Sequence, residues 1–323
     1  MSYTMADALN AALHDAMAHD DSVVILGEDV ATLGGVFRIT ADIERKYGSD
    51  RIFDTPLAES GIVGTAIGMA MYGMRPVVEI QFDGFLYPAF EQMVCHVAKL
   101  RNRTRGALQL PMVIRIPYGG GIGAVEHHSE SPEGYFMQTA GLKVFTPGTP
   151  EDAYSMLREA IADDDPVIFF EPKRRYYEKA EGQLPVTTEP VGEAVVRTTG
   201  DTATVVAYGP MIPTAMEAAA LAVDEGWSLE VIDLRSLNPI DYDTVISSVK
   251  KTGRAVVVHE ASLTLGPGAE IAARIQEGAF YALEAPVQRV TGWDTPYPPA
   301  LLEEEYLPNA DTILNAVERA LDF

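Results

Sequence analysis

The stretch Asp54-Thr-Pro-Leu-Ala-Glu-Ser-Gly-Ile-Val-Gly64 places the carboxylate of Glu59 at the start of an apolar helix. From Ser60 to Met74 no side chain is charged, and the recurring glycines let neighbouring backbones come close to the helix. Glu59 is therefore predicted to lie at the mouth of a buried site. A carboxylate at a helix N-terminus can also simply satisfy free N–H groups and the helix dipole, so the residues alone leave both interpretations open.

Outward from this stretch, predicted strands and helices alternate along the whole chain. Strands are predicted at residues 22–26, 51–54, 76–82, 111–116, 142–145, 167–170, 204–207, 228–233, 255–259 and 287–290. Helices are predicted between them from Thr4, Thr40, Ser60, Pro88, Thr149, Pro213, Asp241 and Gly268, with a last helix ending near Phe323. Such alternation predicts an α/β fold with parallel sheets flanked by helices. The periodicity breaks before Pro190, so we expect domains at residues 1–180 and 191–323 and a linker at 181–190.

The composition narrows the class of protein. With 323 residues and 47% hydrophobic content, the chain can bury two sizeable cores. Its net charge of −23 argues against a nucleic-acid or anionic-membrane surface, since either favours a basic patch. The first residues lack a signal-peptide pattern and no uncharged run is long enough to span a membrane, so we expect a cytoplasmic protein. Cys95 is the only cysteine and is expected to be a small core residue.

Three short segments carry candidate binding groups. Glu28 and Asp29 follow a predicted strand, where open α/β sheets bind ligands, although exposed loop acids are an equal alternative. The segment Tyr118-Gly-Gly-Gly-Ile-Gly123 has the spacing of neither a dinucleotide fingerprint nor a P-loop, so it is predicted to be a flexible active-site loop. Aromatic residues also surround Asp83-Gly84, and such a cluster is by composition more often core than binding site: Phe82, Phe85, Tyr87 and Phe90.

His127 and His128 are flanked by two acids, Glu126 and Glu130. Metal ligation is disfavoured, because neighbours in sequence point in different directions and no cysteine or second histidine cluster completes a ligand set. A structural or surface pair is one alternative. The functional alternative is that one imidazole, at the end of the glycine-rich loop, donates a proton near neutral pH.

Four motifs at fixed mutual spacing carry a family resemblance: Leu26-Gly-Glu-Asp-Val30, Asp54-Thr-Pro-Leu-Ala-Glu-Ser-Gly61, Pro117-Tyr-Gly-Gly-Gly121 and Pro166-Val-Ile-Phe-Phe-Glu-Pro172. Together they resemble the E1 β subunits of thiamine-diphosphate-dependent 2-oxo acid dehydrogenase complexes, in the transketolase-like superfamily. The resemblance covers nearly the whole chain and implies a pyrimidine-binding domain followed by a transketolase-type C-terminal domain. Residues 125–133 and 171–176 are more similar to branched-chain (2-oxoisovalerate) members than to pyruvate members.

The resemblance implies roles for individual residues. Glu59 would activate thiamine diphosphate by driving its aminopyrimidine into the imino form, and an aromatic ring, that of Phe85, would stack on the aminopyrimidine. His128, the histidine before the serine, matches an active-site histidine near the substrate and the lipoyl group. The implied cofactor-binding residues are Glu28, Leu57, Glu59, Gln81 and Phe85. A structural potassium site of some relatives matches Met112, Ala160, Ile161, Asp163 and Asp165.

The chain lacks a Gly-Asp-Gly segment with a following Asn, which the family uses to hold Mg²⁺ and the diphosphate; Gly200-Asp201 is followed by Thr-Ala. The resemblance therefore implies that Mg²⁺ is held by an α subunit in an α2β2 tetramer. It also implies an E2 lipoyl acyltransferase as partner, docking near Glu284 and the C-terminal carboxylate of Phe323.

These inferences predict the β subunit of a branched-chain 2-oxo acid dehydrogenase E1. Pyruvate or acetoin dehydrogenase is the alternative within the family. A non-catalytic scaffold that docks E1 to E2 is the alternative from another class, and the presence of Glu59 and His128 favours the enzyme.

Overall fold

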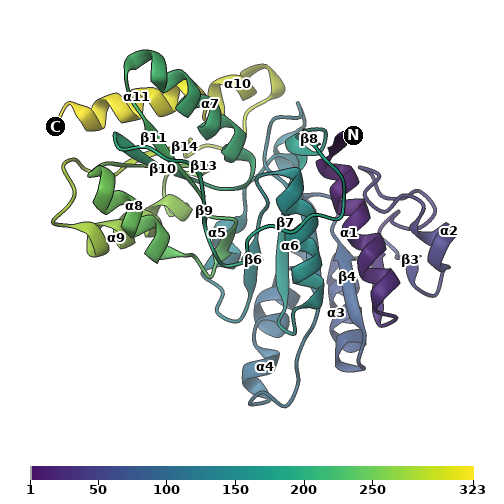
Figure 1. Cartoon of the computed structure of the whole chain (residues 1–323). Coiled ribbons are helices and arrows are strands. Elements are labelled where there is room, and N and C mark those ends of the chain that lie inside the picture. The colour runs from purple at the N-terminus through teal and green to yellow at the C-terminus, as the bar shows by residue number, and fades with distance from the viewer. Residues whose placement is uncertain (1) are drawn as a thin grey trace.

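The computed structural model describes residues 2–323, which form two packed α/β units (Figure 1). The N-terminal unit is built on a seven-stranded sheet with the order β12-β6-β7-β5-β4-β2-β3. Its strands are β2 (Val23–Gly27), β3 (Ile52–Asp54), β4 (Arg75–Glu79), β5 (Val113–Tyr118), β6 (Lys143–Phe145), β7 (Val167–Pro172) and β12 (Ser236–Asn238). Neighbouring strands are parallel except for β12 and β6. One strand of this sheet, β12, thus comes from the second half of the chain.

Helices cover both faces of this sheet, because successive residues of its strands point to opposite sides. One face packs against α1 (Met5–His19) and α6 (Pro150–Ala162). The other face packs against α3 (Glu59–Met71), η1 (Asp83–Ala89), η2 (Gln92–Val97) and α4 (Leu100–Arg103). Shorter helices complete the unit: α2 (Ile43–Tyr47), η3 (Glu126–His128), α5 (Glu133–Met137) and η4 (Lys173–Arg175). The predicted capping box at Thr4 and the Thr149 cap before Pro150 are both present.

The predicted helix from Pro88 to Arg103 is wrong as one continuous α-helix. A 3₁₀ turn containing Pro88 leads into a π-helical turn and then a four-residue α-helix. Within the π-helical turn Met93 and Val97 face the core. Cys95 lies between them and is exposed, so the prediction of a core cysteine is also wrong.

The C-terminal unit has a five-stranded sheet with the order β14-β13-β10-β11-β9. Its strands are β9 (Val195–Thr198), β10 (Ala203–Ala207), β11 (Leu229–Asp233), β13 (Ala255–Ser262) and β14 (Gln288–Gly292). Only β9 runs antiparallel to its neighbour. The helices of this unit are η5 (Gly209–Met211), α7 (Ile212–Ala222), η6 (Val223–Glu225), α8 (Tyr242–Thr252), α9 (Pro267–Ala279), η7 (Ala300–Leu302), α10 (Glu303–Tyr306) and α11 (Ala310–Leu321). Two parallel sheets flanked by helices confirm the predicted α/β class.

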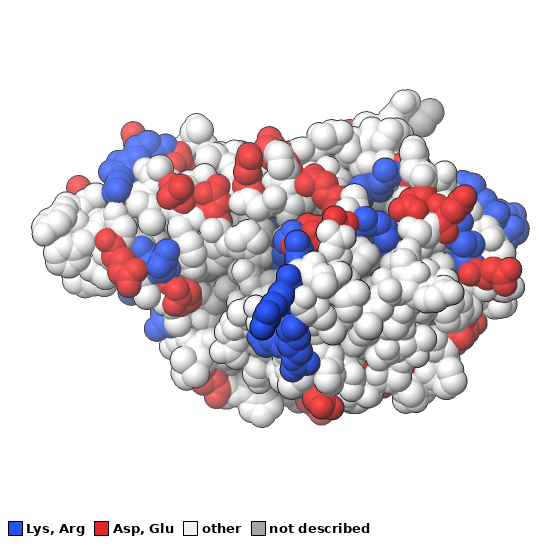
Figure 2. All heavy atoms as spheres, turned by 90° about the horizontal axis from the view of Figure 1, so that it is seen from below, with Lys and Arg blue, Asp and Glu red and all other residues white. Residues whose placement is uncertain are grey.

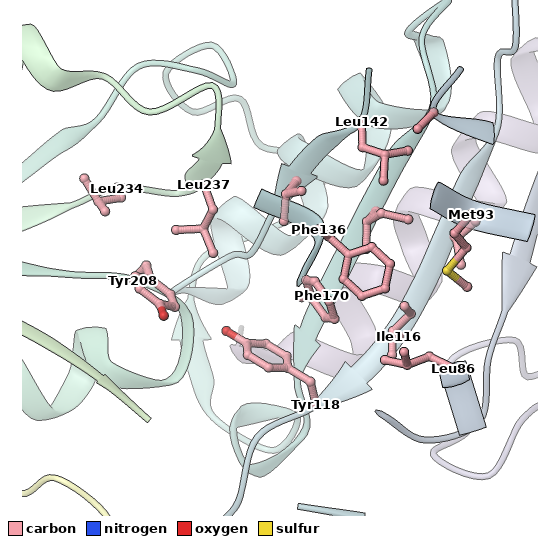
Figure 3. Close-up of a cluster of buried hydrophobic side chains, with 14 of the residues drawn as sticks. Leu86, Met93, Ile116, Tyr118, Phe136, Leu142, Phe170, Tyr208, Leu234 and Leu237 are labelled. Carbon is pink, nitrogen blue, oxygen red and sulfur yellow. The ribbon is translucent and has the colours of Figure 1, made fainter. Parts of the chain in front are cut away.

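A shared core joins the two units. Figure 3 shows this cluster running from Leu234 and Leu237 of the second half, past Tyr118 and Phe170, to Met93 of the first. Between the units, the predicted linker, residues 181–190, begins at the last residue of β8 (Lys179–Glu181), which pairs with β1 (Ser2–Thr4). The relative placement of the units is thus fixed by apolar packing.

A buried ionic network reinforces the junction. Arg235 donates to Asp152 of the first unit and to the carbonyl oxygens of Glu189 and Pro190, at 2.9, 2.7 and 3.1 Å. Arg197 bridges Asp152 and Asp233. The residues predicted as a linker are therefore tied to both units.

Charged side chains of both signs are scattered among uncharged residues on the face seen from below in Figure 2. The basic segment Lys99-Leu-Arg-Asn-Arg-Thr-Arg105 belongs to this side, because α4 forms the lowest part of the molecule in Figure 1. Arg101, Arg103 and Arg105 are exposed there, and Arg101 pairs with Asp165. Across residues 2–323, no helix is long and apolar enough to cross a membrane.

Candidate active site

The strand order of the large sheet creates a switch point between β2 and β4. From β2 the chain passes to β3 at the edge and then crosses back to β4 on the other side of β2. Open α/β sheets bind ligands outside the carboxyl ends of their strands at such a point. Three of the predicted residues follow these strands: Glu28 after β2, Glu59 after β3 at the first position of α3, and Gln81 after β4.

The acids at this switch point are buried and close enough to repel one another. Glu28 is 8% exposed and Glu59 is 5% exposed. Burial, followed by the charges of Glu59 and Asp29, raises the pKa of Glu28. The Oε1 atom of Glu28 is buried and has no hydrogen-bond partner among residues 2–323. Burying a carboxylate oxygen without a hydrogen-bond donor costs free energy, so we infer that a ligand or a water donates to this atom.

Gln81 ties the two strand ends together. Its Nε2 atom donates to the Asp29 carboxylate at 2.9 Å and to the Glu28 carbonyl oxygen at 3.4 Å. Asp29 has a positive φ of 58°, which turns the chain sharply after β2. Of the two acids predicted here, Asp29 is therefore held by Gln81, while one carboxylate oxygen of Glu28 is left without a partner.

His128 packs against the aromatic residues around Asp83-Gly84. Its ring stacks on Phe82 with centroids 4.0 Å apart and meets Phe85 edge-on at 5.1 Å. Phe85 is half-buried and packs against the core that α3 and η1 share. The ring of His127 meets that of His128 edge-on at 4.3 Å and lies 6.4 Å from that of Phe85, but its side chain is 53% exposed and its Nδ1 lies 3.6 Å from Glu126. The two histidines thus have different environments.

A buried ion pair holds the histidine segment in place, and the sequence did not reveal it. Lys173 and Asp83 are fully buried and 2.5 Å apart. The other oxygen of Asp83 accepts the amide of Glu130 at 2.7 Å. Gly84 is needed because a Cβ there would lie 2.1 Å from the carbonyl oxygen of His127. The signal in the sequence was the Asp-Gly pair inside an aromatic cluster, but its partner Lys173 lies 90 residues away.

Of the five residues predicted to bind potassium, Met112 precedes β5, Asp163 and Asp165 precede β7, and Ala160 and Ile161 lie in the last turn of α6. The strand ends here are the amino ends, opposite to the carboxyl ends that carry the acids. Arg75 donates to the carbonyl oxygens of Ile161 and Asp163 at 3.2 and 2.9 Å. Lys143 lies 2.5 Å from the carboxylate of Asp163 and 3.5 Å from that of Asp165. Cationic side chains of the protein therefore hold these oxygens. The potassium site stays a prediction, and no step below depends on it.

The residues predicted to dock E2 lie together on the C-terminal unit. Arg254 pairs with Glu284 at 2.7 Å and donates to the carbonyl oxygen of Ala320 at 3.1 Å. This arginine places Glu284 near Ala320, which lies in the last turn of α11 and three residues before Phe323. Phe323 is 77% exposed and Tyr281 is fully exposed. This surface around Glu284 and Phe323 belongs to the C-terminal unit, whereas the acids and histidines belong to the N-terminal unit.

Comparison with known proteins identifies the family. Residues 1–179 match the family described as "Transketolase, pyrimidine binding domain", and residues 192–313 match "Transketolase, C-terminal domain". The pyruvate dehydrogenase E1 component subunit beta of Leifsonia xyli subsp. xyli is 56% identical over 322 residues, which cover 100% of this chain and 96% of that protein. The chain belongs to the E1 β-subunit family. The predicted resemblance is thereby confirmed, together with the enzyme class, the thiamine-diphosphate-dependent 2-oxo acid dehydrogenases.

Further relatives within the E1 β-subunit family carry different substrate names. The 3-methyl-2-oxobutanoate dehydrogenase subunit beta of Mycobacterium tuberculosis is also 56% identical, over 99% of this chain and 92% of that protein. The 2-oxoisovalerate dehydrogenase subunit beta of Pseudomonas aeruginosa is 45% identical, over 99% and 95%. A solved structure described as "Split gene transketolase, inactive beta4 tetramer" superposes with a TM-score of 0.82 at 26% identity, covering 98% of both chains. The fold is thus similar along its whole length.

Proposed function

We propose that this chain is the β subunit of an E1 component that decarboxylates branched-chain 2-oxo acids and transfers the acyl group to the lipoyl group of E2. The observation that carries the proposal is the buried pair of Glu59 and Glu28 at the switch point of the sheet. The half-buried Phe85 and His128 supply an aromatic wall and an imidazole. The relatives from Mycobacterium tuberculosis and Pseudomonas aeruginosa, which bear branched-chain names, support the substrate class.

The residues present fit thiamine diphosphate. The unpartnered oxygen of buried Glu28 and the buried position of Glu59 suit a ligand that shares a proton with the protein. When bound, the cofactor supplies the carbanion nucleophile and electron sink for decarboxylation. Glu59 would hold the proton shared with the aminopyrimidine, Phe85 would stack on that ring, and Gln81 would border it. Leu57 is 78% exposed and would join the site once a partner chain covers it.

His128 is the proposed proton donor. Stacking on Phe82 and an edge-on contact with Phe85 fix the plane of its imidazole, and its Nδ1 lies 2.9 Å from the carbonyl oxygen of His127. That contact favours a proton on Nδ1 and leaves Nε2 to exchange protons with a substrate. His128 is the histidine that stacks on Phe82, whereas the side chain of His127 is 53% exposed, so His127 is not assigned a role in the reaction.

A partner chain, the α subunit of an α2β2 tetramer, is proposed to hold Mg²⁺ and the diphosphate. Among residues 2–323, no group of three or more His, Cys, Asp or Glu side chains is placed to bind a metal ion. The helix α3 presents an exposed side of small residues for close approach of another chain: Gly61, Thr65 and Gly68 recur on it at helical spacing, and the exposed Tyr72 follows at its C-terminal end. A Cβ at Gly68 would meet no atom within 4 Å.

The E2 acyltransferase is proposed to dock on the surface around Glu284 and the C-terminus. Charge on this surface favours a basic partner, because Glu284 is 60% exposed and the C-terminal carboxylate lies nearby. The exposed rings of Tyr281 and Phe323 supply apolar contact area beside those charges. This site is separate from the acids and the histidine, so E2 capture and decarboxylation are separable activities.

Pyruvate is the second candidate substrate, because the Leifsonia xyli relative of equal identity bears a pyruvate name. The test is turnover of a panel of 2-oxo acids, with acetoin as an additional substrate, by the purified complex of this chain with its α subunit, with lipoyl domain as acceptor. Higher kcat/KM for branched 2-oxo acids than for pyruvate is expected. Preference for pyruvate, or for acetoin, would overturn the substrate class. No turnover of any member would favour the scaffold role.

A further inference from the structure

The glycine-rich segment Tyr118–Gly123 is held by carboxylates of the C-terminal unit. The amide of Gly120 donates to Oε2 of Glu260 at 2.9 Å. The amides of Gly121 and Gly123 donate to the two carboxylate oxygens of Glu303, each at 2.9 Å. In place of the flexible loop predicted from the sequence, three amides of this segment are engaged.

Both acceptor carboxylates are themselves fixed. Glu260, at 3% exposure, lies 2.8 Å from the guanidinium of Arg174. Glu303, at 9% exposure, also accepts the hydroxyl of Tyr297 at 2.6 Å. Hydrogen bonds from backbone amides to an ionised carboxylate are among the stronger ones in proteins. The C-terminal unit therefore presents a rigid anionic surface to the segment.

Gly120 and Gly121 allow the backbone of this segment to lie close to side chains of neighbouring elements. A Cβ on Gly120 would lie 1.9 Å from the hydroxyl oxygen of Tyr297. Gly121 has a φ of +87°, and a Cβ there would meet the side chain of Arg174 at 2.5 Å. Side chains at either position would push the segment away from Glu260 and Glu303. The sequence pattern that suggested an active-site loop is thus explained by contact between the two units.

The same segment leads directly into His128. The amide of Gly119 donates to the carbonyl oxygen of Glu130 at 2.9 Å, which closes residues 119–130 into a loop. One side of this loop is anchored on Asp83 through the amide of Glu130. The other side is anchored on Glu260 and Glu303, and His128 lies between the two anchored parts in the sequence.

We propose that Glu303 is a positioning residue for His128: through the amides of Gly121 and Gly123, the C-terminal unit sets the place of the imidazole used in acyl transfer. This inference rests on the proposed function. Glu303 acts through the loop and contacts neither substrate nor cofactor. The consequence is that loosening this contact impairs the His128 step and leaves the chemistry that depends on Glu59 intact.

The test compares Glu303→Gln with Glu304→Gln in the assembled α2β2 complex. Glu304 is exposed on the same helix and serves as the matched control. The first readout is amide hydrogen–deuterium exchange of residues 118–130. Exchange is expected to rise about tenfold or more in Glu303→Gln, because hydrogen bonds to a charged group are lost, and to stay at the wild-type rate in Glu304→Gln. Wild-type exchange in Glu303→Gln would overturn the proposal.

The second readout is a double-mutant cycle with His128→Ala. Glu303→Gln is expected to lower kcat for acyl transfer to lipoyl domain about tenfold, and to have no further effect when His128 is already alanine. An equal loss in both backgrounds would show a merely structural role. If Glu303→Gln fails to assemble, Tyr297→Phe, which removes one donor to Glu303 and a second acceptor of the Gly121 amide, should give the same pattern at smaller amplitude. Absence of turnover in the wild-type complex would contradict the proposed function. The hydrogen–deuterium exchange result would still show whether Glu303 holds residues 118–130 in place.

Discussion

Replacing Lys173 by methionine is expected to destabilise the protein by about 3–5 kcal/mol, the usual cost of leaving one partner of a buried ion pair alone. The ammonium of Lys173 lies 2.5 Å from Asp83, and both side chains are fully buried. Methionine fills much of the volume but leaves the Asp83 carboxylate with the amide of Glu130 and no counter-charge. Burial already raises the pKa of Asp83, and the ammonium opposes that rise. Without it, the carboxylate should take up a proton more readily.

The assay is urea denaturation followed by circular dichroism, with Lys179→Met as control. Lys179 is exposed on β8, so the same charge change there should alter the free energy of unfolding by no more than about 0.5 kcal/mol. The loss in Lys173→Met should shrink as the pH falls, because protonation of Asp83 removes the buried charge. A loss below about 1 kcal/mol, far under the range for a buried pair, or a loss that does not change with pH, would refute the reasoning.

The remaining predictions concern three other places in the molecule. His128→Ala should suppress acyl transfer by at least about 10²-fold and His127→Ala far less, measured with lipoyl domain as acceptor; equal effects would remove the assignment of His128. Glu284→Lys should weaken E2 capture in a pull-down while decarboxylation with an artificial electron acceptor is unchanged, with Arg254→Gln as the control for loss of the internal ion pair. Burial raises the pKa of Glu133 from 4.5 to about 7, so the folded chain binds a proton more tightly than the unfolded chain. The free energy of unfolding should therefore decrease as the pH rises from about 4.5 to about 7, and Glu133→Gln should make this decrease smaller. An unchanged pH dependence in Glu133→Gln would contradict the assignment.

Local features of the fold were predictable from the sequence. The capping box at Thr4 and the cap at Thr149 depend on residues three apart, and both are present. Alternation of apolar strands and helices placed Glu28 just after a strand and Glu59 at the start of a helix, which is where the structure has them. These signals work because they depend on neighbours in the chain.

Features that depend on distant partners were not predictable. The glycines of residues 119–123 contact Glu260 and Glu303, which lie 140 to 182 residues further along the chain. The sequence showed the glycines but not what approaches them, so a flexible loop was predicted where a fixed one is found. Likewise, the helical pattern from Pro88 gave no sign of the π-helical turn that exposes Cys95. In both cases tertiary packing decided the local conformation.

The most direct test of the account is hydrogen–deuterium exchange at C2 of thiamine diphosphate bound to the complex of Glu59→Gln with its α subunit. Glutamine keeps the shape of the buried side chain and loses the carboxylate that shares the proton, so exchange should slow on the order of 10²–10⁴-fold while assembly and cofactor binding persist. Glu91→Gln, on the exposed side of the segment after η1, should exchange at the wild-type rate. Wild-type exchange in Glu59→Gln would contradict the assignment of Glu59 as the activating acid, and with it the proposed site.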